Sequence, residues 1–224
     1  MSLFLKKNIK DASIGIWEIN ESVEELYSQL TLSPEEEKVF SSLKTPTRKQ
    51  HWLSYRMILP YLVSEHELSA ISYDEYGKPY LNNGVRHISV SHSGKYSALI
   101  ASPVHSVGVD IERIEDKIQK LSHKFLTEQE IAETGRDMSQ DALYIMWAAK
   151  ETLFKLHGKR DILFKDHIYI APFVPHKEGL IYGTIKADDG EKMYAVHYQI
   201  LGDYILSYAV DRSRFSYLNQ HETN

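Results

Sequence analysis

The stretch from Ser139 to Leu156 constrains the fold most, because it predicts one long helix with two faces that both pack. It contains no Pro or Gly, and Gly158 follows it as a stop signal. The apolar residues that recur at helical spacing on the first face are Ala142, Met146, Ala149 and Leu153. The opposite face carries Tyr144, Trp147, Ala148, Glu151 and Lys155. Such a helix is expected to lie between two layers rather than on an open surface.

The second face places an acid, Glu151, one turn before a base, Lys155. The simplest interpretation is a surface ion pair at i, i+4, which stabilises a helix by roughly 0.2–0.5 kcal/mol. Lys150 lies about 100° away from Glu151 around the helix axis, so we expect it beside the site and not in it. What Glu151 does therefore depends on which residues it meets.

Residues 107–112, V-G-V-D-I-E, predict a strand because they are rich in β-branched side chains. Side chains alternate along a strand, so Asp110 and Glu112 project from one face and Val109 and Ile111 from the other. Two neighbouring carboxylates repel each other unless a cation or water lies between them. If Glu151 joins them, the three carboxylates suit Mg²⁺, which keeps other positions for water and substrate phosphate. The alternative is a strand end whose acids reach solvent.

Together, V-G-V-D-I-E at residues 107–112 and W-x-x-K-E-x-x-x-K at residues 147–155 resemble the signature of the 4′-phosphopantetheinyl transferases. Those enzymes move phosphopantetheine from coenzyme A to a serine of a carrier protein. The long region before the first motif resembles their surfactin-synthetase-activating type, a single chain of two similar halves. The sequence departs from the family at Ala148, where Ser, Thr or Cys is frequent, but this position is not an ionisable one.

The resemblance implies an α+β fold of two similar halves, each a small antiparallel sheet with helices, in a pseudo-twofold arrangement. The active site then lies in the crevice between the halves. Asp110, Glu112 and Glu151 would hold Mg²⁺, and Glu151 would take the serine proton directly or through a water. Lys155 would neutralise the developing charge on the phosphate. The implied partners are coenzyme A and an apo acyl or peptidyl carrier protein, and the implied assembly is a monomer built as a pseudo-dimer.

The same resemblance extends to residues that would bind the coenzyme A phosphates. The turn Tyr76–Tyr80 contains the family's G-K-P sequence, which implies that Lys78 points at phosphate. Residues 91–93, S-H-S, match a family segment in which a serine and a histidine hold phosphates, here Ser91 and His92. A basic residue for the 3′-phosphate matches Arg48 best and Lys44 second. Without the resemblance, His92 reads as a turn histidine bonded to backbone.

The composition narrows the class of protein. The 224 residues are 42% hydrophobic and 25% charged, which fits a globular protein of one large or two small domains. We expect no membrane span and no signal peptide, and so a cytoplasmic protein, because no apolar run is long enough for either. A formal net charge of −5 argues against a nucleic-acid partner, and the absence of cysteine excludes disulfide and thiolate chemistry.

Residues 103–106 are predicted to link two halves. The first half, residues 1–105, would bind the coenzyme A phosphates, and the second, residues 106–224, would carry the metal site and the catalytic helix. Strands are predicted at residues 13–19, 87–91, 96–101, 107–112, 168–170, 180–185, 193–200 and 204–210, and a helix at residues 47–63 with a kink or break at Pro60. No sequence repeat between the halves is apparent, so the pseudo-twofold axis rests on the resemblance alone.

Two other functions remain open from the residues themselves. One is a non-catalytic protein that binds coenzyme A or another nucleotide, and the other is a metal-dependent nucleotide phosphohydrolase. For a carrier partner, a short helix after the acidic strand places Lys117, Lys120, Leu121 and Lys124 on one face, with Phe125 nearby. This face predicts a docking surface for an acidic protein, and the alternative is an ordinary amphipathic surface helix.

Overall fold

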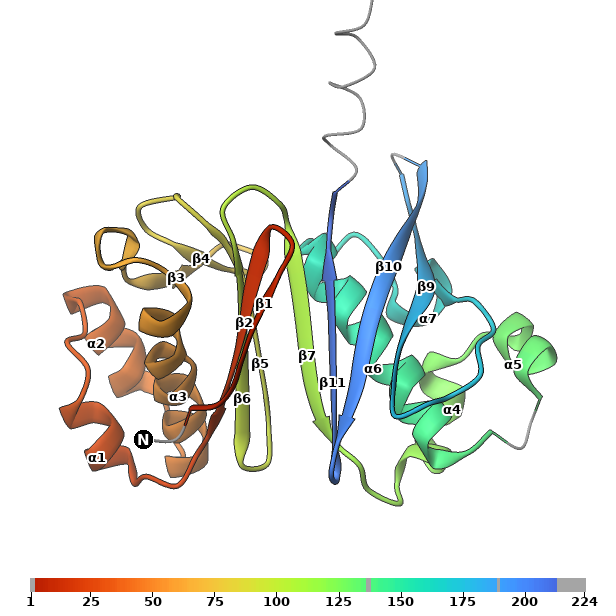
Figure 1. Ribbon diagram of the computed structural model, residues 1–224, viewed down its shortest axis with the longest axis horizontal. Coiled ribbons are helices and arrows are strands. Elements are labelled where there is room, and N and C mark those ends of the chain that lie inside the picture. The colour runs from red at the N-terminus through yellow and green to blue at the C-terminus, as the bar shows by residue number, and fades with distance from the viewer. Residues whose placement is uncertain (1–2, 136–137, 189, 213–224) are drawn as a thin grey trace, which may run out of the picture.

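The computed structural model describes residues 3–135, 138–188 and 190–212, and it contains two antiparallel sheets side by side (Figure 1). The first sheet has the order β1-β2-β6-β5-β4-β3, and the second has the order β7-β11-β10-β9-β8. The strands of the first sheet are β1 (Leu3–Ile9), β2 (Ala12–Glu18), β3 (Ile71–Tyr73), β4 (Pro79–Leu81), β5 (His87–Ser93) and β6 (Tyr96–Ser102). Those of the second are β7 (Val107–Arg113), β8 (Ile168–Ile170), β9 (Glu178–Ala187), β10 (Gly190–Leu201) and β11 (Tyr204–Val210). The α+β class expected from the sequence is confirmed.

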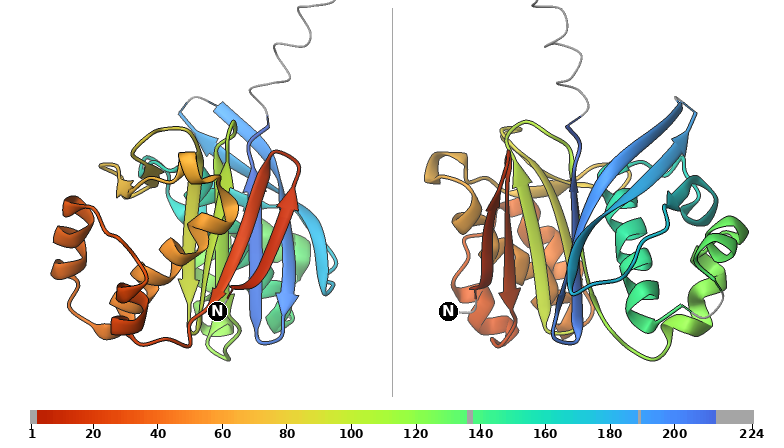
Figure 2. Two further views of the ribbon diagram at one scale, coloured as in Figure 1. Left: turned by 60° about the vertical axis from the view of Figure 1, so that its left-hand side comes forward. Right: turned by 45° about the vertical axis from the view of Figure 1, so that its right-hand side comes forward.

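Helices flank the two sheets at opposite ends of the molecule (Figures 1 and 2). Beside the first sheet lie α1 (Val23–Ser28), α2 (Pro34–Ser42), α3 (Pro46–Leu62) and the short 3₁₀ helix Glu65–Glu67. Beside the second lie α4 (Ile118–Phe125), α5 (Glu128–Thr134), α6 (Gln140–His157) and α7 (Phe164–His167). The long helix expected from the sequence is α6, which Ser139 caps and Gly158 ends in the left-handed conformation with φ of 74°.

Alternation along the strands divides the interior into three cores. Ile14 and Ile16 of β2 face Val109 and Ile111 of β7 in a core between the two sheets. The opposite faces of the sheets pack on helices, so that Trp17 contacts the first group of helices and α6 packs on the second sheet. Each sheet is therefore covered by helices on one face and by the other sheet on the other face.

The two halves repeat one chain path. In each half a strand leads into three α-helices and then one short helix, which is the 3₁₀ helix Glu65–Glu67 in the first half and α7 in the second, and four further strands complete the sheet. The order β2-β6-β5-β4-β3 in the first sheet matches β7-β11-β10-β9-β8 in the second, with β1 as an extra edge strand. The expectation of two similar halves is confirmed by this topology.

The structure also reveals a sequence repeat that the sequence alone did not show. Ser33 caps α2 and Thr127 caps α5, and each forms a capping box with a glutamate three residues later, Glu36 or Glu130. Each glutamate then binds a base twenty residues further on, Arg56 in α3 or Lys150 in α6. All three positions of the second half lie 94 residues after their counterparts. Side-chain chemistry and spacing are kept while residue identities change, which hid the repeat.

Other differences from the sequence expectations are local. Strand β1 was missed because Lys6, Lys7 and Asn8 interrupt its apolar pattern. The kink or break expected at Pro60 does not end α3, which continues to Leu62 because Pro60 falls in its last turn. Residues 213–224, assigned to the second half, lie outside the described residues. None of the described helices is both long enough and apolar enough to cross a membrane.

Candidate functional site

The junction between the sheets is held along β5 and β7 by serine side chains. Ser89 accepts a hydrogen bond from the Val109 amide at 3.2 Å, and Ser93 accepts one from the Arg113 amide at 3.1 Å. These serines stand on one face of β5, four residues apart, because side chains alternate along a strand. They bring the first half against the strand that carries the predicted metal ligands.

A glycine lets α6 approach the same strand closely. A Cβ atom added to Gly108 would fall well inside van der Waals contact of the Thr152 carbonyl oxygen and would touch Leu156. Because α6 lies this near, the face of the helix that carries Glu151 is brought against the face of β7 that carries Asp110 and Glu112. The convergence expected from the sequence rests on this close packing.

A cleft of about 390 Å³ opens where the two halves meet. Its first wall comes from α3, β3 and β5, and its second from β7 and α6. The lining residues are Leu43, Arg48, Trp52, Tyr55, Tyr73, Val90, Ser91 and His92 from the first half, with Asp110, Glu112, Glu151 and Lys155 from the second. Seven of the nine site residues predicted from the sequence line this one cleft, and Lys44 and Lys78 do not.

The acids of the cleft have unequal partners. Asp110 is buried and accepts hydrogen bonds on Oδ1 from Lys155 Nζ at 2.6 Å and Ser91 Oγ at 2.8 Å. Glu112 accepts from Ser93 Oγ at 3.1 Å and from Trp147 Nε1 at 3.3 Å. Asp110 Oδ2 is buried with no hydrogen-bond partner among the described residues.

Crowding of negative charge changes the acidity of these groups. Burial, and then the nearby Asp110, raise the pKa of Glu151 to about 7. The same two causes in the same order raise the pKa of Glu112. Lys155 opposes both shifts but does not cancel them. A cation between the three carboxylates would remove this repulsion.

The residues present fit a divalent cation, although no ready-made coordination shell exists. Within the described ranges, no three acidic, histidine or cysteine side chains are close enough together to hold a metal as they stand. Asp110 Oδ1 is bound by the Lys155 ammonium. The unpartnered Oδ2 of the same carboxylate is the kind of buried oxygen that a hard cation satisfies.

Two rings shape the first-half side of the cleft. His92 stacks on His51, with 4.2 Å between ring centroids, and His51 Nε2 lies 2.8 Å from the Gly94 carbonyl oxygen. Partial burial first, and then the nearby His51 and Lys155, lower the pKa of His92 to about 4. At neutral pH the imidazole is therefore uncharged, with one face against His51.

The basic residues expected near phosphate are distributed unevenly. Arg48 is exposed and lines the cleft, whereas Lys44 is exposed outside it. Lys78 donates to the Leu156 carbonyl oxygen at 2.8 Å, so it caps the end of α6, and burial lowers its pKa. Lys78 also lines a smaller hollow of about 150 Å³ that shares Tyr73 and Lys155 with the cleft.

Lys150 is buried away from the cleft. Its ammonium donates to Glu130 Oε2 at 2.8 Å and to the Ile168 carbonyl oxygen at 2.5 Å. Burial lowers the pKa of Lys150, while Glu130 opposes that shift. The orientation expected from the helix period is thus what the structure has.

Sequence reasoning overlooked several residues of the site. Ser93 follows Ser91 by two positions on the same strand face, and Trp147 precedes Glu151 by one helical turn, so both were within reach of periodicity. The hydroxyl pair of Tyr55 and Tyr73 and the stacking of His51 on His92 join distant parts of the chain. No local sequence pattern predicts contacts between residues that are so far apart in the chain.

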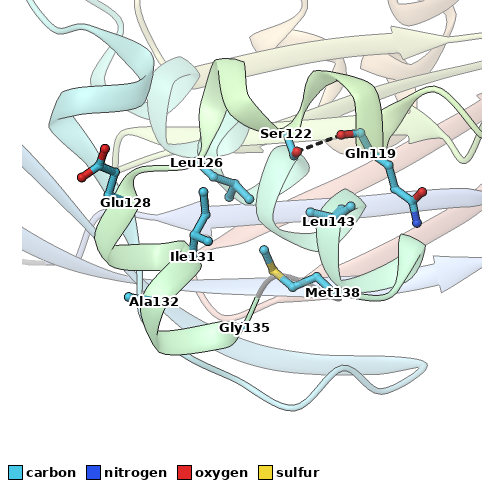
Figure 3. Close-up of a pocket in the computed structure, with 9 residues that line it drawn as sticks. All are labelled: Gln119, Ser122, Leu126, Glu128, Ile131, Ala132, Gly135, Met138 and Leu143. Carbon is cyan, nitrogen blue, oxygen red and sulfur yellow. Dashed lines mark hydrogen bonds between the residues drawn. The ribbon is translucent and has the colours of Figure 1, made fainter.

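A larger hollow, of about 1190 Å³, lies elsewhere, between α4, α5 and the start of α6 (Figure 3). Polar and apolar side chains share its lining, which consists of Gln119, Ser122, Leu126, Glu128, Ile131, Ala132, Gly135, Met138 and Leu143. Glu128 is the one ionisable side chain among the described residues that line it. The exposed Lys120 and Lys124 lie on the other flank of α4, and Phe125, expected near them, is buried in the core.

Comparison with known proteins agrees with the geometry of the second half. The 4′-phosphopantetheinyl transferase superfamily matches residues 106–209. The 4′-phosphopantetheinyl transferase gsp of Aneurinibacillus migulanus is 32% identical over 38% of this chain and 37% of its own length. Sfp of Bacillus subtilis is 24% identical over 60% of this chain and 69% of its own length.

A relative of another type is equally similar. The 4′-phosphopantetheinyl transferase AcpT of Salmonella typhimurium is 32% identical over 50% of this chain and 60% of its own length. The matched region therefore spans between about two fifths and two thirds of the length of these relatives. The region that matches the 4′-phosphopantetheinyl transferase superfamily includes the strand and helix that bear Asp110, Glu112, Glu151 and Lys155.

Proposed function

We propose that this protein transfers 4′-phosphopantetheine from coenzyme A to a serine of an acyl or peptidyl carrier protein. We further propose the single-chain type represented by Sfp, in which residues 1–105 bind the coenzyme A phosphates and residues 106–224 supply the metal site and catalytic helix. The observation that carries the proposal is the composite cleft. Phosphate-binding candidates from one half and a carboxylate cluster from the other face the same space.

The reaction joins the serine oxygen to the β-phosphorus of coenzyme A. The bond from that phosphorus to the bridging oxygen breaks, and adenosine 3′,5′-bisphosphate leaves. Glu151 takes the serine proton, directly or through a water, because no described residue donates a hydrogen bond to it and its oxygens are free to accept. Lys155 can turn from Asp110 to the phosphate and neutralise its charge. Positioning and charge stabilisation are the main needs of such a step.

Binding of the coenzyme is assigned to the first half. Ser91 offers its hydroxyl and His92 an imidazole edge to the diphosphate, and Arg48 is the better-placed base for the 3′-phosphate. Lys78 acts on the ligand through the end of α6, or reaches it from the adjoining hollow. Asp110, Glu112 and Glu151 would hold Mg²⁺. When bound, this ion would screen the diphosphate and lower the charge that the serine oxygen must approach.

The carrier is proposed to dock on the exposed lysines of α4. Lys117, just before α4, forms an ion pair with Glu115 at 2.5 Å, and this ion pair raises the pKa of Lys117. Lys117, Lys120 and Lys124 together offer a positive surface to an acidic carrier, although the chain has a formal net charge of −5.

Mass spectrometry of an apo-carrier protein incubated with this protein, coenzyme A and Mg²⁺ tests the proposed function. A gain equal to phosphopantetheine on the carrier, with adenosine 3′,5′-bisphosphate released, is the expected result. Bound coenzyme A with an unmodified carrier would instead identify a binding protein. Release of the nucleotide with no gain on the carrier would identify a phosphohydrolase.

A further inference from the structure

The repeat of the two halves includes a buried acid–base pair that the proposed chemistry does not use. In the second half, Glu130 accepts a hydrogen bond from the Ile170 amide at 2.8 Å and forms an ion pair with Lys150 at 2.8 Å. Both side chains of the ion pair are fully buried. Lys150 also donates to the Ile168 carbonyl. One ion pair thus ties α5 and α6 to the edge strand β8.

The first half contains the same construction. Glu36 accepts the Ile71 amide at 3.1 Å and binds Arg56 at 2.8 Å, with both side chains almost fully buried. Arg56 donates to the Ile71 carbonyl at 3.1 Å. One ion pair thus ties α2 and α3 to the edge strand β3. We call these pairs the first brace (Glu36–Arg56) and the second brace (Glu130–Lys150).

The braces end next to different parts of the cleft. Lys150 directly precedes Glu151 in α6, so the second brace fixes the rotation of the helix at the residue that faces the other carboxylates. Arg56 directly follows Tyr55, and its guanidinium lies 3.2 Å from the centre of the Trp52 ring. Trp52 and Tyr55 form an aromatic part of the first-half wall of the cleft.

We propose that Glu130 and Lys150 are positioning residues for the catalytic carboxylate Glu151, whereas Glu36 and Arg56 position the wall that receives coenzyme A. This inference rests on the proposed function. Two braces of the same construction would then serve two separable tasks. Loosening the second brace should slow the chemical step, because misplacing a reacting group by about 1 Å can cost roughly 10²-fold. Loosening the first should weaken coenzyme A binding.

The test compares two double variants that remove each brace without leaving a lone buried charge. They are Glu130→Gln with Lys150→Met, and Glu36→Gln with Arg56→Met. The exposed pair Lys186–Glu191 supplies the matched control, Glu191→Gln with Lys186→Met. For each, the thermal midpoint, the kcat and KM of carrier modification, and the calorimetric Kd for coenzyme A are measured below the midpoint of the least stable variant.

We expect both brace variants to melt at lower temperature than the control. The second-brace variant should lose about tenfold or more in kcat at saturating coenzyme A, with KM and Kd within about threefold of the parent. The first-brace variant should raise KM and Kd for coenzyme A by about tenfold or more, with kcat within about threefold of the parent. The single variant Lys150→Arg, with Glu130 intact, should have the kcat of the parent, because Arg56 already fills the equivalent position in the first half.

Equal effects of the two braces on kcat and on KM would overturn the inference and leave two purely structural ion pairs. So would a lowered melting temperature with unchanged kinetics. The parent protein is assayed first. A parent that does not modify the carrier contradicts the proposed function. If the parent is active but the two brace variants change kcat and KM alike, only the positioning roles are contradicted.

Discussion

Among single residues, Glu151 has the most specific chemistry. It lies beside Asp110 and Glu112 in a site where burial and those charges raise its pKa to about 7. A carboxylate of this kind is costly to fold and is retained where it reacts.

Replacing Glu151 by Gln tests that role. We expect single-turnover transfer at saturating Mg²⁺ to fall by more than tenfold, which is about 1.4 kcal/mol of lost transition-state stabilisation. The thermal midpoint should stay the same or rise, because one of three repelling charges is gone. The exposed Glu128→Gln variant should match the parent. A Glu151→Gln rate within about tenfold of the parent would remove the base role.

His92 permits a second test with binding alone. Its proposed contact is with phosphate. His92→Ala should therefore raise the Kd for coenzyme A by a larger factor than the Kd for pantetheine, which lacks the phosphates. Calorimetric titration with both ligands measures the two ratios, and exposed His66→Ala controls for loss of an imidazole. If both ligands lose the same factor, His92 does not bind phosphate.

At the scale of elements, the packing of α6 on β7 brings the carboxylates together. We expect Gly108→Ala to destabilise the protein by about 1–3 kcal/mol, because its Cβ would collide with the backbone oxygen of Thr152. The counterpart Gly15→Ala meets side-chain atoms of Ile58 and Leu62 and should cost less. Urea denaturation of both variants compares the two losses. A Gly15→Ala loss equal to or larger than that of Gly108→Ala would show that α6 is not held so tightly.

Helix α4 is the proposed docking element for the carrier. Reversing Lys120 and Lys124 to Glu should raise the KM for the carrier at low salt and leave the Kd for coenzyme A unchanged. The difference should shrink with added salt, because charges are screened over about 8–10 Å at ionic strengths of 0.1–0.15 M. Reversing Lys177 and Lys186 changes the net charge equally on other exposed segments. If this control raises the KM for the carrier as much, the effect comes from the overall charge and not from α4.

The elements show what sequence could and could not predict. Helix α6 and strand β7 were predictable because their burial follows local periodicity, which also placed Asp110, Glu112, Glu151 and Lys155 on the correct faces. The use of Lys78 as a cap for α6 was not predictable, because it joins positions 78 residues apart. The paired braces keep chemistry and spacing but exchange Arg for Lys and Ser for Thr, so letter-by-letter comparison of the halves misses them.

At the scale of the whole molecule, the two halves share one topology but differ in the residues they place at the cleft. Strand order, helix caps and braces are repeated, yet only the second half has acids at the cleft. With the shift of 94 residues, Glu151 corresponds to Met57 and Lys155 to Tyr61, and the Tyr61 ring instead packs against Trp17. The first half therefore has the same scaffold without the acids, and it lines the cleft mainly through β5 and α3.

The central claim is that both halves build one site, and coupling between them measures it most directly. Ser91 of the first half donates to Asp110 of the second at 2.8 Å. Single-turnover transfer rates are measured for Ser91→Ala, Asp110→Asn and the double variant, with the exposed Ser28→Ala replacing Ser91→Ala in a control cycle. A composite site predicts a coupling energy of about 0.5–3 kcal/mol for Ser91 with Asp110 and additivity for Ser28 with Asp110. Additive effects of Ser91 and Asp110, within about 0.5 kcal/mol, would contradict a site shared by the two halves.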